Sequence, residues 1–132
     1  MNQEKVVQNT TDGYRLSFNY RADTVRISKS TMVVLGNPKY IQFLINLEKK
    51  QLFIHGTNTR EQNCIEVPGK DPRNRCNFVL YGLSCIKKIS NIAGWDLEGV
   101  FTLTGVYLSE FNIVRFDLLS AERRQSEFKT ED

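Results

Sequence analysis

Few residues of this chain have the types and spacing that catalysis or metal binding requires. The sequence holds one histidine, His55, with no second histidine to share a metal ion. The three cysteines are Cys64, Cys76 and Cys85. They include no Cys-x-x-Cys pair, so neither a zinc site nor a disulfide framework is indicated. Burial is the ordinary role for such cysteines, and a structural role is the ordinary one for a lone histidine at the end of a strand.

Motifs for nucleophilic catalysis or phosphate transfer are also missing from the sequence. No glycine-rich phosphate loop follows a strand, and no Ser-His-Asp or Cys-His motif is present. Asp96 and Glu98 form a local carboxylate pair beside a predicted turn, where acids are usually solvated. We therefore predict a protein that is not an enzyme and that uses no cofactor or metal.

Basic residues provide the main indication of a binding function. The chain has 18 Lys and Arg residues against 15 Asp and Glu residues, a net charge of +3, so phosphate binding would require a local patch. The candidates are Arg15, Arg21, Arg26, Lys29, Lys87 and Lys88. Clustered on one face, they would contact the phosphates of double-stranded DNA, with an affinity that falls as salt rises. The alternative is that they are ordinary solvated residues, because exposed strand positions are commonly Arg or Lys.

Length and composition predict one soluble domain. A chain of 132 residues is close to the commonest domain size, and 40% hydrophobic with 25% charged residues is ordinary for a globular protein. No apolar run approaches the ~18 residues of a membrane span. The N-terminal MNQEKVVQNTTDG lacks the basic start and apolar core of a signal peptide. We therefore expect a cytoplasmic protein without a membrane partner.

The first elements follow from alternation of apolar and polar residues. Residues 14–20 alternate with a period of two, which predicts a strand with Arg15 and Arg21 on the face opposite its apolar residues. Ala22 and Asp23 suit a turn into a second strand over residues 24–28.

A short helix and a hairpin should follow. Ser28 or Ser30 is a suitable N-cap, Gly36 a suitable helix end, and residues 40–54 alternate as a hairpin. The buried side of this helix is predicted to be Met32, Val33 and Leu35.

The same order of elements returns later in the chain. A strand near residue 78 precedes a helix with Ile86, Ile89 and Ile92 at helical spacing, with Ser84 as its cap and Gly94 as its end. Strands over 100–107 and 112–118 follow, and Trp95 is expected to pack over the base of this hairpin. We therefore predict an α+β fold, a small β-barrel built from two pseudo-symmetric β-α-ββ units. The units cover about 24–55 and 78–116, joined by a connection over 56–77, with tails at 1–12 and 120–132.

This repeated unit resembles the AbrB, MazE and SpoVT swapped-hairpin domains. VRISKSTMVVLGNP is similar to the strand, helix and Leu-Gly turn of that family, and IAGWDLEGVFTLTG is similar to its helix end and entering strand. Members normally build one barrel from two identical chains and bind DNA. The resemblance implies that one chain supplies both halves here, as a monomer or weak homo-oligomer, and that the protein is a bacterial DNA-binding transcription regulator.

One departure from the family supports a second hypothesis. Family members contact DNA mainly through arginines at the start of the first strand and on the short helix. Alignment on Leu35 and Gly36 puts Thr24, Met32 and Val33 at those positions, and the second unit has Ser90 and Asn91 there. The alternative is a protein-protein interaction module, antitoxin-like or from a mobile element, that has kept the barrel and lost DNA binding. Clustering of exposed Tyr40, Phe111 or Phe128 would favour it.

Overall fold

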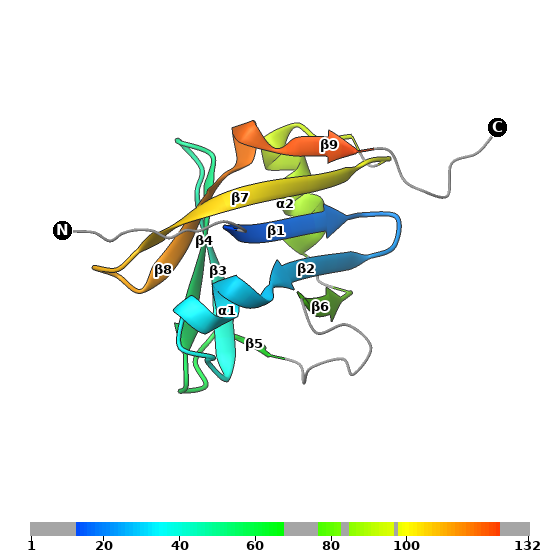
Figure 1. The fold of residues 1–132 in the computed structure, drawn as a ribbon. Helices are drawn as coiled ribbons and strands as arrows, with labels where there is room; N and C mark the ends of the chain where they lie inside the picture. Colours follow the sequence, from blue (N-terminus) through cyan, green and yellow to red (C-terminus); the bar gives the residue numbers. More distant parts are fainter. Residues whose placement is uncertain (1–12, 68–76, 83–84, 97, 125–132) are drawn as a thin grey trace.

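The computed structural model describes residues 13–67, 77–82, 85–96 and 98–124. They form a mostly antiparallel β-sheet that curves into a half-barrel, with few helices (Figure 1). This agrees with the predicted small barrel at the level of strand content and curvature. Among the described residues there is no helix with the length and apolar character needed to cross a membrane.

The elements along the chain include the predicted strands and helices and also β5, η2 and β9. The strands are β1 (Tyr14–Asn19), β2 (Thr24–Ser28), β3 (Tyr40–Asn46), β4 (Gln51–Thr57), β5 (Ile65–Glu66), β6 (Asn77–Tyr81), β7 (Val100–Leu108), β8 (Ile113–Asp117) and β9 (Glu122–Arg124). The helical segments are α1 (Lys29–Val34), α2 (Cys85–Ala93) and the 3-10 turn η2 (Leu118–Ser120). Neighbouring strands pair in the order β5-β3-β4-β8-β7-β1-β2-β6, and β9 pairs with β7.

The β1–β2 hairpin confirms the predicted alternation. Leu16 and Phe18 are buried, whereas Arg15, the residue before Leu16, is exposed on the other face. Leu16 lies opposite Ile27 in the antiparallel register, so the buried residues of both strands share one face. The turn is closed by the side-chain oxygen of Asn19, which accepts a hydrogen bond from the Ala22 amide at 3.0 Å.

Helix α1 has the predicted caps, and its buried side includes the predicted Met32 and Leu35 but not Val33. The Ser28 hydroxyl accepts from the Thr31 amide at 3.4 Å, and Gly36, with φ at +91°, permits the left-handed turn that ends the helix. Val33, predicted to be buried, is 51% exposed, whereas Thr31 and Met32 are buried. At 3.6 residues per turn, positions 31, 32 and 35 share one side of a helix and position 33 lies on the other.

Helix α2 covers the inner face of the sheet. Ile86 and Ile89 are buried in the same core as Leu16 and Phe18. Figure 1 shows α2 behind the sheet formed by β7, β1 and β2. The helix ends at Gly94, and the predicted cap at Ser84 lies outside the described residues.

Three aromatic rings, those of Trp95, Phe101 and Phe18, pack together next to the end of α2. The Trp95 ring stacks on Phe101 with centroids 4.6 Å apart and also contacts Phe18 at 5.4 Å in a tilted arrangement. Both partners belong to the sheet, on β7 and β1. Trp95 was predicted to pack over the base of the β7–β8 hairpin; its ring contacts lie instead at the start of β7 and on β1, before the part of β7 that pairs with β8.

The C-terminal segment differs from the predicted tail. The chain makes the 3-10 turn η2 after β8, and residues 122–124 then pair with β7 as β9. β8 and β9 both pair with β7, at different parts of that strand. β8 opposes residues 105–108 of β7, and β9 opposes residues 100–102. The predicted tail began at residue 120; the strand β9 lies within it, and residues 125–132 lie outside the described part.

Candidate nucleic-acid interface

One side of the strands β9, β7, β1, β2 and β6 lies opposite the core, and we call this side the outer face. Most of its side chains are exposed or partly exposed, and Thr24 is buried. Side chains alternate along each strand, so the residues opposite the buried core positions belong to it. Cross-strand register arranges them in three rows. The rows are Thr104–Arg15–Ser28, then Glu122–Thr102–Ser17–Arg26–Val79, then Arg124–Val100–Asn19–Thr24–Tyr81.

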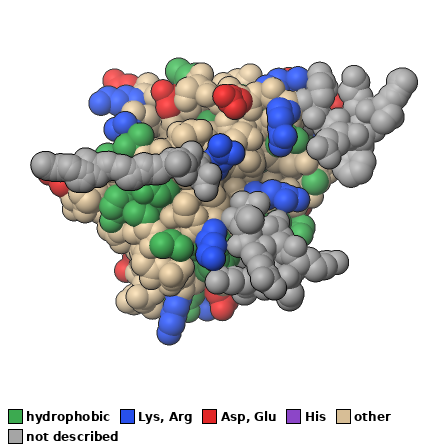
Figure 2. Space-filling model, in the orientation of Figure 1, with side chains coloured by type: hydrophobic (Ala, Val, Ile, Leu, Met, Phe, Trp, Pro, Cys, Tyr) green, Lys and Arg blue, Asp and Glu red, His purple; other side chains and the backbone are tan. Residues whose placement is uncertain are grey.

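Arg15 and Arg26, two of the six candidates for a basic patch, come together on the outer face. Arg26 lies opposite Ser17, which places it diagonal to Arg15, and such neighbours are about 7–8 Å apart. Both residues are exposed. Lys29, also exposed, follows directly where α1 begins beside the end of β2. Figure 2 shows this side of the molecule, with Lys and Arg side chains along its middle.

Arg21 lies at the edge of this group, in the turn between β1 and β2. Its guanidinium Nη1 is 3.7 Å from Glu98 Oε1, and the two side chains are 54% and 73% exposed. An ion pair this open to solvent stabilises the fold little. It does place a negative charge beside Arg21, which reduces the attraction of this arginine for phosphate.

Lys87 and Lys88 lie elsewhere on the molecule. They are exposed residues of α2, whose buried residues Ile86 and Ile89 pack against the inner side of the sheet. The solvent-facing side of α2 therefore points away from the outer face. The structure does not bring these two lysines together with Arg15 and Arg26.

Arg124 joins the outer face although the sequence analysis did not include it. It lies opposite Val100 on β7, in the row that continues to Asn19. The segment containing it is charged and mixed in sign, and a three-residue strand is too short to show an alternating pattern. Only its pairing with β7 reveals its position.

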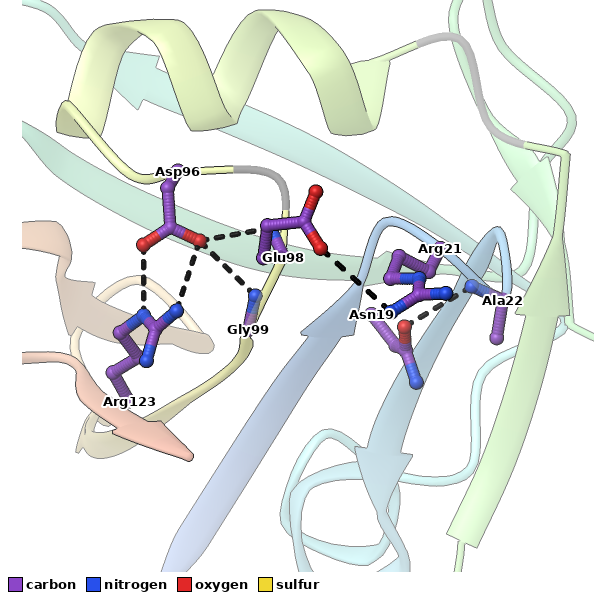
Figure 3. A network of polar contacts seen from close by, with 7 residues as sticks. All are labelled: Asn19, Arg21, Ala22, Asp96, Glu98, Gly99 and Arg123. Carbon is purple, nitrogen blue, oxygen red and sulfur yellow. Dashed lines mark hydrogen bonds and ion pairs between the residues drawn. The ribbon is translucent and has the colours of Figure 1, made fainter. Parts of the chain in front are cut away.

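Arg123 is held on the other side of β9 by Asp96 (Figure 3). Arg123 Nε donates to Asp96 Oδ2 at 2.8 Å and Nη2 donates to Oδ1 at 3.3 Å. The Asp96 carboxylate also accepts from the backbone amides of Glu98 and Gly99, at 2.8 and 3.1 Å. The hydrogen bond from Arg123, followed by that from the Glu98 amide, lowers the pKa of Asp96 below its ordinary value.

The neighbourhood of Arg123 is shaped to hold it. Its guanidinium carbon is 5.9 Å from the centre of the Phe101 ring, a cation–π arrangement at the open end of the aromatic stack. A Cβ on Gly99 would come within 2.8 Å of Arg123 Nε, so a side chain at this position would require Arg123 to shift. The Asp96 and Glu98 pair is therefore part of an anchor for β9, which in turn carries Arg124 onto the outer face.

The histidine and the cysteines of the described residues lie apart from the outer face. His55 Nδ1 is 3.1 Å from Gln42 Oε1 on the neighbouring strand. Burial raises the pKa of the half-buried Cys85 thiol, which disfavours the nucleophilic thiolate. Cys64 is free and partly buried, and Cys76 lies outside the described residues. Within the described ranges no three His, Cys, Asp or Glu residues are grouped so that they could hold a metal ion.

Comparisons with protein-family models, with curated proteins and with solved structures found no match for this chain.

Proposed function

We propose that this protein is a non-enzymatic DNA-binding protein that contacts phosphates through its outer face. The observation that carries the proposal is the placement of Arg15 and Arg26 as diagonal neighbours on one exposed sheet face. Lys29 and Arg124 extend the same positive surface at its two sides. Within the three rows of described residues, Glu122 is the acidic member.

The surface between these basic residues suits contact with a polar ligand. Ser17 Oγ and Thr102 Oγ1 lie 3.1 Å apart at its centre, and Asn19 lies in the adjacent row. Hydroxyl and amide groups hydrogen-bond to phosphate and sugar oxygens and so position a nucleic acid without reading its sequence. Four phosphate contacts, from Arg15, Arg26, Lys29 and Arg124, would give duplex binding a salt slope of about −3.6.

The biological role that we propose is that of an AbrB-like bacterial transcription regulator with two β-α-ββ units in one chain. The pairing pattern supports this duplication. The duplication would relate β1 to β5, β2 to β6, β3 to β7 and β4 to β8. Under this exchange the β3–β4 pair becomes β7–β8, and the β1–β7 pair becomes β5–β3. The β2–β6 and β4–β8 pairs map onto themselves. The β1–β2 pair has no counterpart among the pairings of the described residues.

The test is fluorescence anisotropy of a labelled random-sequence DNA duplex at about 50 and about 200 mM salt. Arg15→Ala with Arg26→Ala should weaken binding and make the salt slope shallower by about 2, one for each lost phosphate contact. Lys87→Ala with Lys88→Ala removes the same charge from the opposite side and serves as the matched control. Absence of binding by the unaltered protein at the lower salt concentration, or equal losses in both double variants, would reject the proposal.

A second candidate function, binding of another protein, is favoured by the other half of the sheet. On β3, β4, β8 and β7 the outward side chains include a row of Leu44, Phe53, Arg115 and Val106. Leu44 is 46% and Val106 50% exposed. Of the residues named for this function, Phe111 is 64% exposed, Tyr40 is partly buried and Phe128 lies outside the described residues.

Light scattering across a dilution series tests whether this apolar row joins two copies of the chain. A dimer that Leu44→Glu with Val106→Glu converts to a monomer would support self-association through this surface. An unaltered protein that stays monomeric at all concentrations would remove this form of the candidate.

A further inference from the structure

The outer face carries an aromatic side chain that packing does not explain. Tyr81, at the end of β6, is 72% exposed. Its strand position places it opposite Thr24, in the row that ends at Arg124. The preceding residues of β6, Phe78 and Leu80, are buried on the other face, so the phase of the strand directs Tyr81 outward. A tyrosine this exposed leaves most of its ring surface in contact with water.

Tyr81 lies directly beside the basic residues. Arg26 is opposite Val79, two residues before Tyr81, which makes Arg26 and Tyr81 diagonal neighbours about 7–8 Å apart. Arg26 is also the diagonal neighbour of Arg15. The three side chains thus form a path across β6, β2 and β1, with an aromatic ring at one end and two positive charges after it.

The dimensions of the outer face disfavour insertion into a DNA duplex. Five strands at about 4.8 Å spacing give a surface about 19 Å wide. The major groove is about 12 Å wide and admits a helix or a two-stranded ribbon. Helix α1, with six residues, is about 9 Å long and presents only a short side to a groove. The outer face can therefore lie against the phosphates of a duplex, and it would reach the base edges only if the duplex were bent or opened.

A single strand fits this surface better, because its bases are free to turn toward the protein. Proteins that bind single strands combine basic side chains along the backbone with aromatic rings on which bases stack. Tyr81 provides such a ring, while Arg26 and Arg15 are placed to contact the phosphates that follow. The hydroxyl groups of Ser17 and Thr102 lie next along the sheet, within reach of sugars or base edges.

We infer that the outer face binds single-stranded nucleic acid in preference to duplex, with one base stacked on Tyr81 and the adjoining phosphates held by Arg26 and Arg15. This inference rests on the proposed function, because it assumes that the outer face is the DNA-binding surface. It goes further by assigning the strandedness of the ligand and a stacking residue. Sequence preference is expected to be small, since every base has a face that can stack.

The experiment compares one labelled oligonucleotide as a single strand and annealed to its complement, at about 50 mM salt. Single-strand binding should be the tighter. Tyr81→Ala should weaken it about 5- to 150-fold, the effect of losing one stacked base, with a much smaller effect on the duplex. Tyr81→Phe keeps the ring and should bind like the unaltered protein.

Phe111→Ala is the matched control, because Phe111 is an exposed aromatic residue in the turn between β7 and β8. It should leave single-strand binding unchanged. Thermal unfolding establishes that each variant is folded, and Tyr81→Leu, which keeps an apolar side chain without a ring, replaces Tyr81→Ala if the latter is unstable.

The outcomes separate this inference from the proposed function. Equal or tighter binding of the duplex, or a Tyr81→Ala variant that behaves like Phe111→Ala, overturns the inference. The proposed function survives that result if Arg15→Ala with Arg26→Ala still weakens binding. Failure to bind either form overturns both.

Discussion

Arg123 and Asp96 form a two-point contact between β9 and the segment that follows α2, with Nε–Oδ2 at 2.8 Å and Nη2–Oδ1 at 3.3 Å. This contact joins two parts of the chain that are 27 positions apart. It lies at the end of the aromatic stack, where Arg123 also faces Phe101. β9 has three residues, so its backbone pairing with β7 is short, and this side-chain contact adds to it. The contact made by Arg123 lies next to Arg124, which the pairing places on the outer face.

The stability of the protein should depend on the ionisation of Asp96. Its pKa in the folded protein lies below the ordinary value of 3.8, so the ionised form contributes stability above that value and loses it as pH falls through the folded pKa. We expect the difference in unfolding free energy between the unaltered protein and Asp96→Asn to shrink as pH is lowered below 3.8. Urea unfolding at a series of pH values measures this. Glu110→Gln, in the β7–β8 turn, is the control, and a difference that stays constant with pH would contradict the expectation.

Removal of Arg123 should shift the titration of Asp96 directly. The Arg123 hydrogen bond is the largest cause of the lowered pKa, so Arg123→Ala should raise the pKa of Asp96 toward its ordinary value. Arg123→Lys keeps the charge but not the two-point geometry, and should give an intermediate pKa. The carboxyl carbon chemical shift followed by NMR reports the pKa of Asp96 in each variant. An unchanged pKa in Arg123→Ala would show that the backbone amides of Glu98 and Gly99 suffice.

Gly105 should not tolerate a side chain. A Cβ at this position would lie 2.6 Å from Phe116 Cε1 and 2.7 Å from Val114 Cγ1, both in the buried core. Gly105→Ala should destabilise the fold by about 1–3 kcal/mol, because the neighbouring side chains must leave their preferred positions. Thr104→Ala, on the outer face, is the control for denaturant unfolding. If Phe116 is the main obstacle, Phe116→Leu should reduce the additional cost of Gly105→Ala.

The buried and exposed sides of the short α1 region can be distinguished by stability. Leu35 is 5% exposed and Val33 is 51% exposed. Leu35→Ala should cost about 2–5 kcal/mol, whereas Val33→Ala should stay within about 0.5 kcal/mol. The midpoint of urea unfolding measures both. A large loss in Val33→Ala would mean that this side chain is covered in solution.

Ser28 should contribute more than an ordinary helix cap. Its hydroxyl oxygen accepts from the Thr31 amide and also from the Arg15 amide, at 3.4 and 3.0 Å, so it joins α1 to β1. Ser28→Ala should destabilise the protein by about 1–2 kcal/mol, the upper part of the range for lost caps. Ser109→Ala, in the exposed β7–β8 turn, provides the comparison in thermal unfolding. Equal effects of the two substitutions would contradict this role.

Most of the strands could be predicted because each carries its own alternating pattern. In β1 the buried Leu16 and Phe18 alternate with polar residues, and in β4 the buried Leu52 and Ile54 alternate with less buried residues, one of which is Phe53. Helix ends were equally clear, since Gly36 and Gly94 adopt the positive φ angles that favour glycine. The buried side of α1 was less certain, because in a helix of six residues a shift of one position turns a side chain by about 100°.

The candidate interface was only partly visible in the sequence. The direction of Arg15 follows from alternation within β1 alone. Its proximity to Arg26 depends on the register of the hairpin, and its separation from Lys87 and Lys88 depends on which side of the sheet α2 covers. Tyr81 and Arg124 reach the same surface because β6 pairs with β2 and β9 pairs with β7. No local pattern specifies either pairing.

The sequence by itself therefore determined the local elements: the period-two strands, the glycine-terminated helices and their order along the chain. These features arise from interactions between residues that are close in sequence, so short segments suffice to indicate them. Only the tertiary structure decided which strands are neighbours and which charged residues share a face. Those relationships depend on burying the apolar sides of distant segments together, as when Trp95 stacks on Phe101 and contacts Phe18, and Arg123 lies over the Phe101 ring.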